Sequence, residues 1–385
     1  MKSEFNKNVF IPSFLLYFGF IGITFPFLAI YYKEINLSMK EVGFLFSLQG
    51  LVMILVQQIW GYLADEVFSP KRVLIFTSLS GGVFFFVVGL TQNFYLLVFF
   101  VLLYLTFHTP NIQILNSLLL MYPGGKERYS FIRAFGSLGF IIFNVLMGVV
   151  AKNFKLWFMF PIGMTLYILF AFIVRKLPEI SSEKIKKTSF LDIQKFFFTH
   201  PEVIKLLILI FFYQIAHSSG YLFQSFLIKD YGGTDADMGF CYSLAALLEI
   251  PVFLFLDKII SKFGEKFLIC MAILSQILRW LGVYFSSSLL HIYLLQSLHP
   301  FSFGFFYIGT VIYMNRLAGR KFQSSAQTLH GLVYHGLAML VGNLAGGQIV
   351  GTFGLKPLYL FGTFSTIISF LILFTLKRGD IKNGL

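Results

Sequence analysis

The sequence predicts an all-α membrane protein, and three observations support this fold class. The 385 residues are 57% hydrophobic and 12% charged, with a mean hydropathy of +0.80, whereas soluble domains carry roughly 25% charged residues. The apolar residues form long runs, and the alternating pattern of strands is absent, which favours helices over an outer-membrane barrel. One long polar stretch divides these runs into two sets of six.

A bilayer crossing requires about 20 apolar residues, and twelve runs meet this length. In chain order we expect helices over residues 10–32, 42–64, 72–91, 94–119, 131–151, 155–174, 203–228, 238–256, 266–285, 290–314, 325–350 and 356–376. The first run has no small-residue cleavage site, so we expect it to be a retained span. The fold is then two six-helix pseudo-repeats around a central cavity: an N-terminal bundle (1–174), a cytoplasmic loop (175–202) and a C-terminal bundle (203–385).

Basic residues predict the orientation. If both termini are cytoplasmic, 22 of the 30 lysines and arginines lie at cytoplasmic ends and loops, and six lie on the opposite side. We therefore expect a multi-pass protein of the cell's inner (plasma) membrane. Because the bases occupy short loops, the net charge of +13 does not indicate nucleic acid. Cys241 and Cys270 lie in apolar runs without a CxxC pattern, so we expect neither a disulfide nor a metal site.

Arg133, Arg279 and Glu249 fall inside predicted spans. A charge at the centre of a membrane helix costs roughly 2.5–3.5 kcal/mol, so such a charge usually faces water or a partner. At ~1.5 Å per residue, Glu249, His299 and Arg279 lie about 17, 14 and 9 Å from the outer ends of their helices. We expect these three to form a proton-coupling site, with Glu249 as the proton carrier, Arg279 controlling its charge and His299 linking proton to substrate. The alternatives are a protonated Glu249 bonded to a neighbouring helix and a packing role for His299.

Polar residues at helical spacing share a face on six predicted spans. The stripes are Gln214, His217, Ser218, Tyr221, Gln224 and Ser225; Ser275, Gln276, Arg279 and Gly282; Gln296, His299 and Ser302; Gln327, His330 and Tyr334; Arg133, Ser137 and Asn144; and, on the fourth span, His108 and Asn111 on one side with Thr109, Gln113 and Asn116 on another. A single stripe is equally explained by hydrogen bonding between packed helices. The presence of such stripes on six spans favours one aqueous cavity that the helices share. His217, Tyr221 and Gln296 are candidate substrate-binding residues.

A loop pattern recurs in the two halves. Gly61-Tyr62-Leu63-Ala64-Asp65 precedes Lys71-Arg72, and Asp257-Lys258 precedes Gly264-Glu265-Lys266. Two repeats with a site between them are typical of transporters. The first loop resembles the signature of the major facilitator superfamily, although Ser69-Pro70 replace its usual glycine. The resemblance implies that Gly61, Asp65, Lys71 and Arg72, with Asp257 in the second half, brace the bundle during switching; the alternative is a loop that only sets topology.

Two further motifs narrow the resemblance. Residues 129–140 (YSFIRAFGSLGF) are similar to the fifth-helix motif of the lactose permease and 3-phenylpropionate permease-like group, and residues 296–304 (QSLHPFSFG) resemble the tenth-helix motif of the latter branch. This resemblance implies that Arg133 binds substrate. Asn116 stands in the region where the lactose permease has a carboxylate for that arginine, which favours an anionic substrate. Ser302 replaces a tenth-helix carboxylate, so the lactose permease proton site does not carry over and lactose is not expected.

These inferences predict a proton-coupled symporter that works by alternating access. The expected substrate is an aromatic carboxylate, a nucleoside or a sugar, and the expected partners are protons and membrane lipid, with no cofactor beyond the proton gradient and no nucleic acid. We expect a monomer. The alternatives are a proton-driven exporter of lipophilic compounds and a membrane-embedded enzyme acting on lipids. The sequence has neither HExxH nor GxSxG, which disfavours the enzyme.

Overall fold

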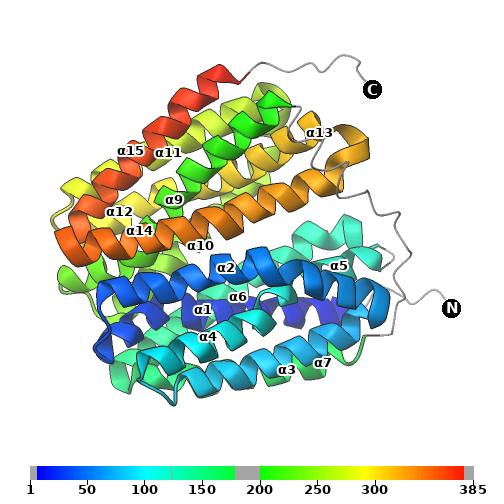
Figure 1. The fold of residues 1–385 in the computed structure, drawn as a ribbon, viewed down its shortest axis with the longest axis vertical. Helices are drawn as coiled ribbons and strands as arrows, with labels where there is room; N and C mark the ends of the chain where they lie inside the picture. The colour runs from blue at the N-terminus through cyan, green and yellow to red at the C-terminus, as the bar shows by residue number, and fades with distance from the viewer. Residues whose placement is uncertain (1–6, 123, 178–199, 377–385) are drawn as a thin grey trace. The chain divides into compact units, whose positions relative to one another are not determined.

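A computed structural model describes residues 7–122, 124–177 and 200–376, and its regular elements are helices throughout this part of the chain (Figure 1). The predicted all-α class is confirmed. The chain forms two compact units, one containing Met1–Lys184 with Ser225–Leu247 and the other Ile185–Gln224 with Leu248–Leu385. Most of the predicted 175–202 loop lies outside the described residues, so the predicted domain boundaries stay predictions.

The N-terminal unit contains seven α-helices before the central gap in the described residues. They are α1 (Lys7–Glu34), α2 (Met39–Tyr62), α3 (Pro70–Val88), α4 (Phe94–His108), α5 (Pro110–Met121), α6 (Gly125–Asn153) and α7 (Met159–Val174), with a π-helical segment η1 (Leu63–Val67) and a 3₁₀ turn η2 (Leu156–Phe158). Capping residues determine where two of these helices begin. Ser38 and Glu41 form a capping box at the start of α2, and Ser69 caps α3 ahead of Pro70. These side chains satisfy backbone N–H groups that the first helical turn leaves without partners.

After the gap, the chain continues with long helices that are interrupted twice. The elements are α9 (Pro201–Asp230), α10 (Asp235–Phe263), α11 (Glu265–Phe285), α12 (Leu289–Leu295), η3 (Gln296–Leu298), η4 (Phe301–Phe305), α13 (Phe306–Gly331), η5 (Leu332–Leu337), α14 (Ala338–Phe353) and α15 (Leu355–Thr375). They belong to the C-terminal unit except for Ser225–Leu247, at the end of α9 and the start of α10, which belong to the N-terminal unit. Pro300 lacks an N–H and precedes the π-helical η4. Gly319 breaks α13 with φ of 62°, a left-handed conformation that favours glycine.

Helices lie at all twelve predicted positions, generally extending a few residues beyond the predicted ends. Ten helices of the described part are long and apolar enough to cross a membrane. The predicted spans 238–256 and 290–314 coincide with α10 and with the α12–α13 run, which are not among those ten. The count of twelve membrane spans therefore stays a prediction.

Small residues allow close helix packing within each unit. A Cβ on Gly139 would lie 2.2 Å from Leu15 O, where α6 crosses α1. A Cβ on Gly342 would lie 2.8 Å from Ile215 O, and one on Gly346 would lie 2.8 Å from Ser219 Cβ. The Gly342-x-x-x-Gly346 motif thus lets α14 approach α9 closely, as small-residue motifs do in membrane helices.

The core of the C-terminal unit determines which faces of its helices carry polar groups. Leu209 and Tyr213 of α9, Ile269 and Ala272 of α11 and Phe306 of α13 are fully buried in one apolar cluster. Since residues three and four apart share a helical face, the polar stripes that follow on α9 and α11 remain on neighbouring faces inside the unit. This packing brings side chains from several helices together around Arg279.

Candidate functional site

Arg279, His299 and Glu249 form one continuous chain of contacts within the C-terminal unit. Arg279 Nη1 lies 2.7 Å from His299 Nδ1, and His299 Nε2 lies 3.0 Å from Glu249 Oε1. Arg279 is 1% exposed and His299 4% exposed, whereas the Glu249 side chain is 13% exposed. The structure therefore brings the three predicted proton-coupling residues together, with the histidine between the other two.

The contacts dictate where protons sit on His299. A guanidinium only donates hydrogen bonds, so Arg279 donates to Nδ1, and Nδ1 carries no proton. A neutral imidazole then has its proton on Nε2, and Nε2–H donates to Glu249 Oε1. Glu249 accepts this bond, so the arrangement favours its carboxylate form. A proton bound by this carboxylate would remove its negative charge and leave Oε1 a weaker acceptor for His299.

Two glutamines and two aromatic rings complete the environment of Arg279. Its Nη2 donates to Gln296 Oε1 at 2.9 Å and to Gln224 Oε1 at 3.3 Å. The guanidinium carbon lies 4.7 Å from the centre of the Trp280 ring and 5.6 Å from that of Tyr221. A buried cation is costly unless it is paired and hydrogen-bonded, and these groups supply that compensation. Gln296 and Tyr221, two predicted substrate-binding residues, thus lie against Arg279.

His217 belongs to the same cluster through a separate hydrogen-bond path. The amide Nε2 of Gln276 donates to Tyr213 O and Thr366 Oγ1, both at 3.0 Å. Gln276 Oε1 is therefore the acceptor for His217 Nδ1–H at 3.1 Å. The His217 ring stacks 5.8 Å from that of His299. The predicted substrate-binding role of His217 stays a prediction, and its orientation is determined by Gln276.

Arg133 and Asn116 lie in the N-terminal unit. The Arg133 guanidinium carbon sits 4.0 Å above the ring of Phe18 on α1. Asn116 Oδ1 accepts a hydrogen bond from Tyr129 Oη at 3.3 Å, and Tyr129 lies one helical turn before Arg133 on α6. Asn116 thus contacts α6 at Tyr129, and the substrate-binding roles of Arg133 and Asn116 stay predictions.

The loop residues of the signature are only partly described. The side chains of Asp65 and Asp257 lie outside what the structure describes, and Gly61 is exposed at the end of α2. Arg72 is exposed, and its backbone N–H donates to Ser69 Oγ. Lys71 Nζ donates to the carbonyl of Leu177 at 2.5 Å, just after the end of α7. The bracing role of these loop residues stays a prediction.

The sequence patterns placed Gln224, Gln276 and Tyr334 on polar stripes but assigned them no role in the site. Gln224 holds Arg279, and Gln276 holds His217. Tyr334 is 1% exposed, and its hydroxyl has no hydrogen-bond partner within the described residues. The only sequence signal for these three residues was their position on a polar stripe. Spacing does not show which stripes face each other, because that depends on how each helix is rotated.

The fold and the buried ionisable cluster define a polytopic membrane transporter. The chain belongs to the MFS_1 like family, whose model matches residues 12–361. It is 26% identical to the maltose permease of Geobacillus stearothermophilus, over 98% of this chain and 96% of that protein. It is 22% identical to the putative nucleoside transporter YegT of Escherichia coli (strain K12), over 86% of this chain and 81% of that one.

Solved structures show the same fold. The crystal structure of a mutant of the nucleoside transporter NupG matches with a TM-score of 0.85 and 17% identity, over 96% of this chain and 99% of that chain. The predicted major facilitator fold is confirmed. The family consists of transporters, which agrees with the expectation that the protein moves a small solute and is not an enzyme.

Proposed function

We propose that this protein is a proton-coupled symporter of a small organic solute, with Glu249 as its proton carrier. The observation that carries the proposal is the Arg279–His299–Glu249 chain of contacts, with distances of 2.7 and 3.0 Å. Intramembrane carboxylates and histidines of this kind often mark proton relays. Glu249 stands at one end of this series of contacts, and its side chain is partly exposed. It is therefore the residue of the three that a proton can reach.

The tautomer of His299 supplies a coupling step. With Glu249 ionised, the histidine is held between a cation and an anion. When Glu249 binds a proton, its carboxyl becomes an uncharged and weaker acceptor for the Nε2–H of His299, and the contact between α10 and the α12–α13 run is weakened. A proton thus changes the contacts between these helices, which alternating access requires. Release of the proton restores the contact and resets the carrier.

The substrate proposal follows the relatives. The names of the similar proteins indicate maltose for one and nucleosides for another, which supports sugars and nucleosides as substrate classes. An aromatic carboxylate as the substrate is supported only by the positive charge of Arg133. We also propose that the protein works as a monomer in the inner membrane with both termini in the cytoplasm, on the evidence of its lysine and arginine distribution.

The proposal is tested with purified protein in proteoliposomes. Glucose, uridine and benzoate are offered with and without an inward proton gradient, and uptake and internal pH are followed together. We expect Glu249→Gln to abolish accumulation against a concentration gradient while equilibrium exchange of the same solute continues, because the amide mimics a permanently protonated carboxyl. Exchange by this variant should not depend on pH.

A matched control is Glu66→Gln, since Glu66 is exposed beyond the end of α2. This variant should accumulate solute like the unmodified protein. Gradient-driven accumulation at the unmodified rate in Glu249→Gln would refute the assignment of Glu249. Solute movement out of vesicles of defined orientation in exchange for protons would replace symport with export.

A further inference from the structure

Aromatic rings contact the His299 imidazole in addition to its two hydrogen-bond partners. The Phe303 ring lies parallel to the His299 ring, at an angle of 4° and with the ring centres 5.6 Å apart. On α9, the Tyr221 ring lies 5.0 Å from that of His299 at an angle of 13°. These separations are typical of offset-stacked rings. The orientation of His299 therefore depends on ring contacts as well as on hydrogen bonds.

Side-chain hydrogen bonds hold the backbone next to Phe303. This residue lies in the π-helical η4, which follows Pro300. Proline lacks an N–H, and a π-helical turn changes the usual backbone pairing, so carbonyls in this stretch take side-chain donors. Ser302 Oγ donates to His299 O at 3.1 Å, and the Tyr213 hydroxyl donates to Ser302 O. These two bonds hold the turn that places the Phe303 ring beside His299.

The plane of the His299 ring decides whether the proton-coupling contacts exist. Its Nδ1 lies 2.7 Å from Arg279 Nη1, and its Nε2 lies 3.0 Å from Glu249 Oε1. Hydrogen bonds at a planar nitrogen are strongest near the plane of the ring. A rotation about the Cβ–Cγ bond of His299 would turn Nδ1 away from Arg279 and Nε2 away from Glu249. The site therefore requires one particular ring plane.

The hydrogen bonds alone do not fix this plane throughout the proposed cycle. After Glu249 binds a proton, its carboxyl is uncharged and accepts more weakly from the Nε2–H of His299. Stacking on Phe303 involves the faces of the two rings and does not depend on the charge of Glu249. The Phe303 ring thus supplies a restraint that is present in both protonation states of Glu249.

We propose that Phe303 is a positioning residue of the proton-coupling site: its ring fixes the plane of the His299 imidazole, so that His299 stays turned towards Glu249 while the carboxyl is protonated. The inference rests on the proposed transport function and adds to it a residue that binds neither proton nor charge. Without the Phe303 ring, His299 can turn away after each protonation. The contact with Glu249 then re-forms less often, and less solute accumulates for the same proton gradient.

The first test is spectroscopic and does not depend on transport. Purified full-length protein with isotopically labelled histidine is studied in bilayers by nitrogen NMR, and the signals of His299 are those that His299→Gln removes. In Glu249→Gln, which mimics the protonated carboxyl, we expect one set of His299 signals, with Nε2 protonated and Nδ1 unprotonated. Adding Phe303→Leu should raise the population of rings that are turned away about fivefold, or ~1 kcal/mol, which is the size of one stacked pair. Identical His299 spectra with and without the Phe303 ring would overturn the proposal.

The second test is proton-driven uptake of whichever of glucose, uridine and benzoate the unmodified protein accumulates. Phe303→Leu should lower the accumulation ratio several-fold, whereas Phe303→Tyr keeps a ring and should accumulate normally. Phe303→Met, which fills a similar volume without a ring, should behave like the leucine variant and decides the question if that variant fails to fold. The matched control is Phe301→Leu in the same π-helical turn, because the Phe301 ring packs edge-on against Phe305. This control should accumulate normally.

The outcomes for Phe303 and for Glu249 are distinguishable. Normal accumulation in Phe303→Leu, together with its loss in Glu249→Gln, would overturn the role of Phe303 and leave the proposed function standing. Equal losses in Phe303→Leu and Phe303→Tyr would show that Phe303 only packs, and would also overturn the proposal. Normal accumulation in Glu249→Gln would refute the proposed function, and the His299 spectra would still decide whether Phe303 holds the ring.

Discussion

At the scale of single residues, the site depends on how each buried polar group is satisfied. Arg279 has three hydrogen-bond acceptors, and His299 uses both ring nitrogens. The hydroxyl of Tyr334 differs, because it is buried without a hydrogen-bond partner in the described chain. An unsatisfied buried group costs roughly 1–3 kcal/mol, and such costs persist where function requires them. Tyr334 lies on one of the predicted polar stripes, so we infer that this function is transport.

We therefore expect Tyr334→Phe to raise thermal stability and to slow proton-driven uptake. Removing the hydroxyl removes the desolvation cost, so the melting temperature in detergent should rise by a few degrees, on the order of 1 kcal/mol. Uptake should fall if the hydroxyl contacts the proton carrier during the cycle. The control is Tyr95→Phe, at an 81% exposed residue, which should change neither property. A Tyr334→Phe protein with lower stability would show that the hydroxyl has a partner in the membrane.

At the scale of elements, the same contact occurs in the two repeats. Lys71 at the start of α3 donates to Leu177 O, just past α7, and Lys266 at the start of α11 donates to Leu376 O, just past α15. A cation at a helix C-terminus also interacts favourably with the helix dipole. Each lysine thus ties the third predicted span of its half to the sixth, at equivalent positions.

We expect Lys71→Met and Lys266→Met each to destabilise the protein by about 1 kcal/mol, a value reduced for the partial exposure of the lysines. Lys71→Arg and Lys266→Arg should retain most of the stability because they keep the charge. Melting temperatures measured in detergent, with the exposed Lys152→Met as control, would check this. Equal stability in all the methionine variants would show that these hydrogen bonds contribute nothing.

Element positions were predictable, and element interruptions were not. Run lengths predicted the helices because the bilayer core imposes a minimum length on any span. The break before η4 depends on Pro300 and that in α13 on Gly319, and both residues are also tolerated within membrane helices. Hydropathy therefore did not distinguish a broken helix from a continuous one at these positions.

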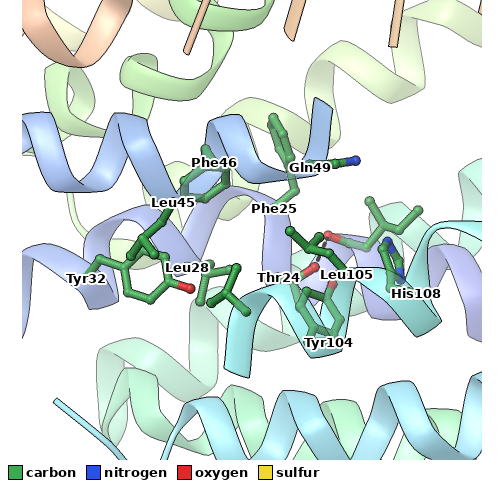
Figure 2. A pocket seen from close by; sticks show the side chains of 12 residues that line it. Thr24, Phe25, Leu28, Tyr32, Leu45, Phe46, Gln49, Tyr104, Leu105 and His108 are labelled. Atoms are coloured by element: carbon green, nitrogen blue, oxygen red, sulfur yellow. Dashed lines mark hydrogen bonds between the residues drawn. The ribbon is translucent and has the colours of Figure 1, made fainter. Parts of the chain in front are cut away.

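At the scale of the whole molecule, the ionisable cluster and a pocket in the N-terminal unit differ in how visible they are in the sequence. Arg279 and Glu249 are conspicuous because charge is rare in apolar runs. The residues that line the pocket between α1, α2 and α4 (Figure 2), such as Phe25, Phe46 and Leu105, are of the same types that face lipid, so only the coordinates separate pocket lining from filler. The position of His299 between Arg279 and Glu249 likewise depends on helix rotation, which spacing alone does not determine.

Membrane topology is also a property of the whole molecule, and cysteine labelling tests it. In a variant with Cys241 and Cys270 replaced by serine, a cysteine is introduced at Ser287 or Ser261, which are both exposed. Ser287 follows α11 in a segment without basic residues, whereas Ser261 lies between Lys258 and Lys262. The positive-inside rule predicts that a membrane-impermeant maleimide labels Ser287→Cys in intact cells and labels Ser261→Cys only after permeabilisation. The reverse pattern would invert the orientation, and with it the direction in which protons from outside reach Glu249.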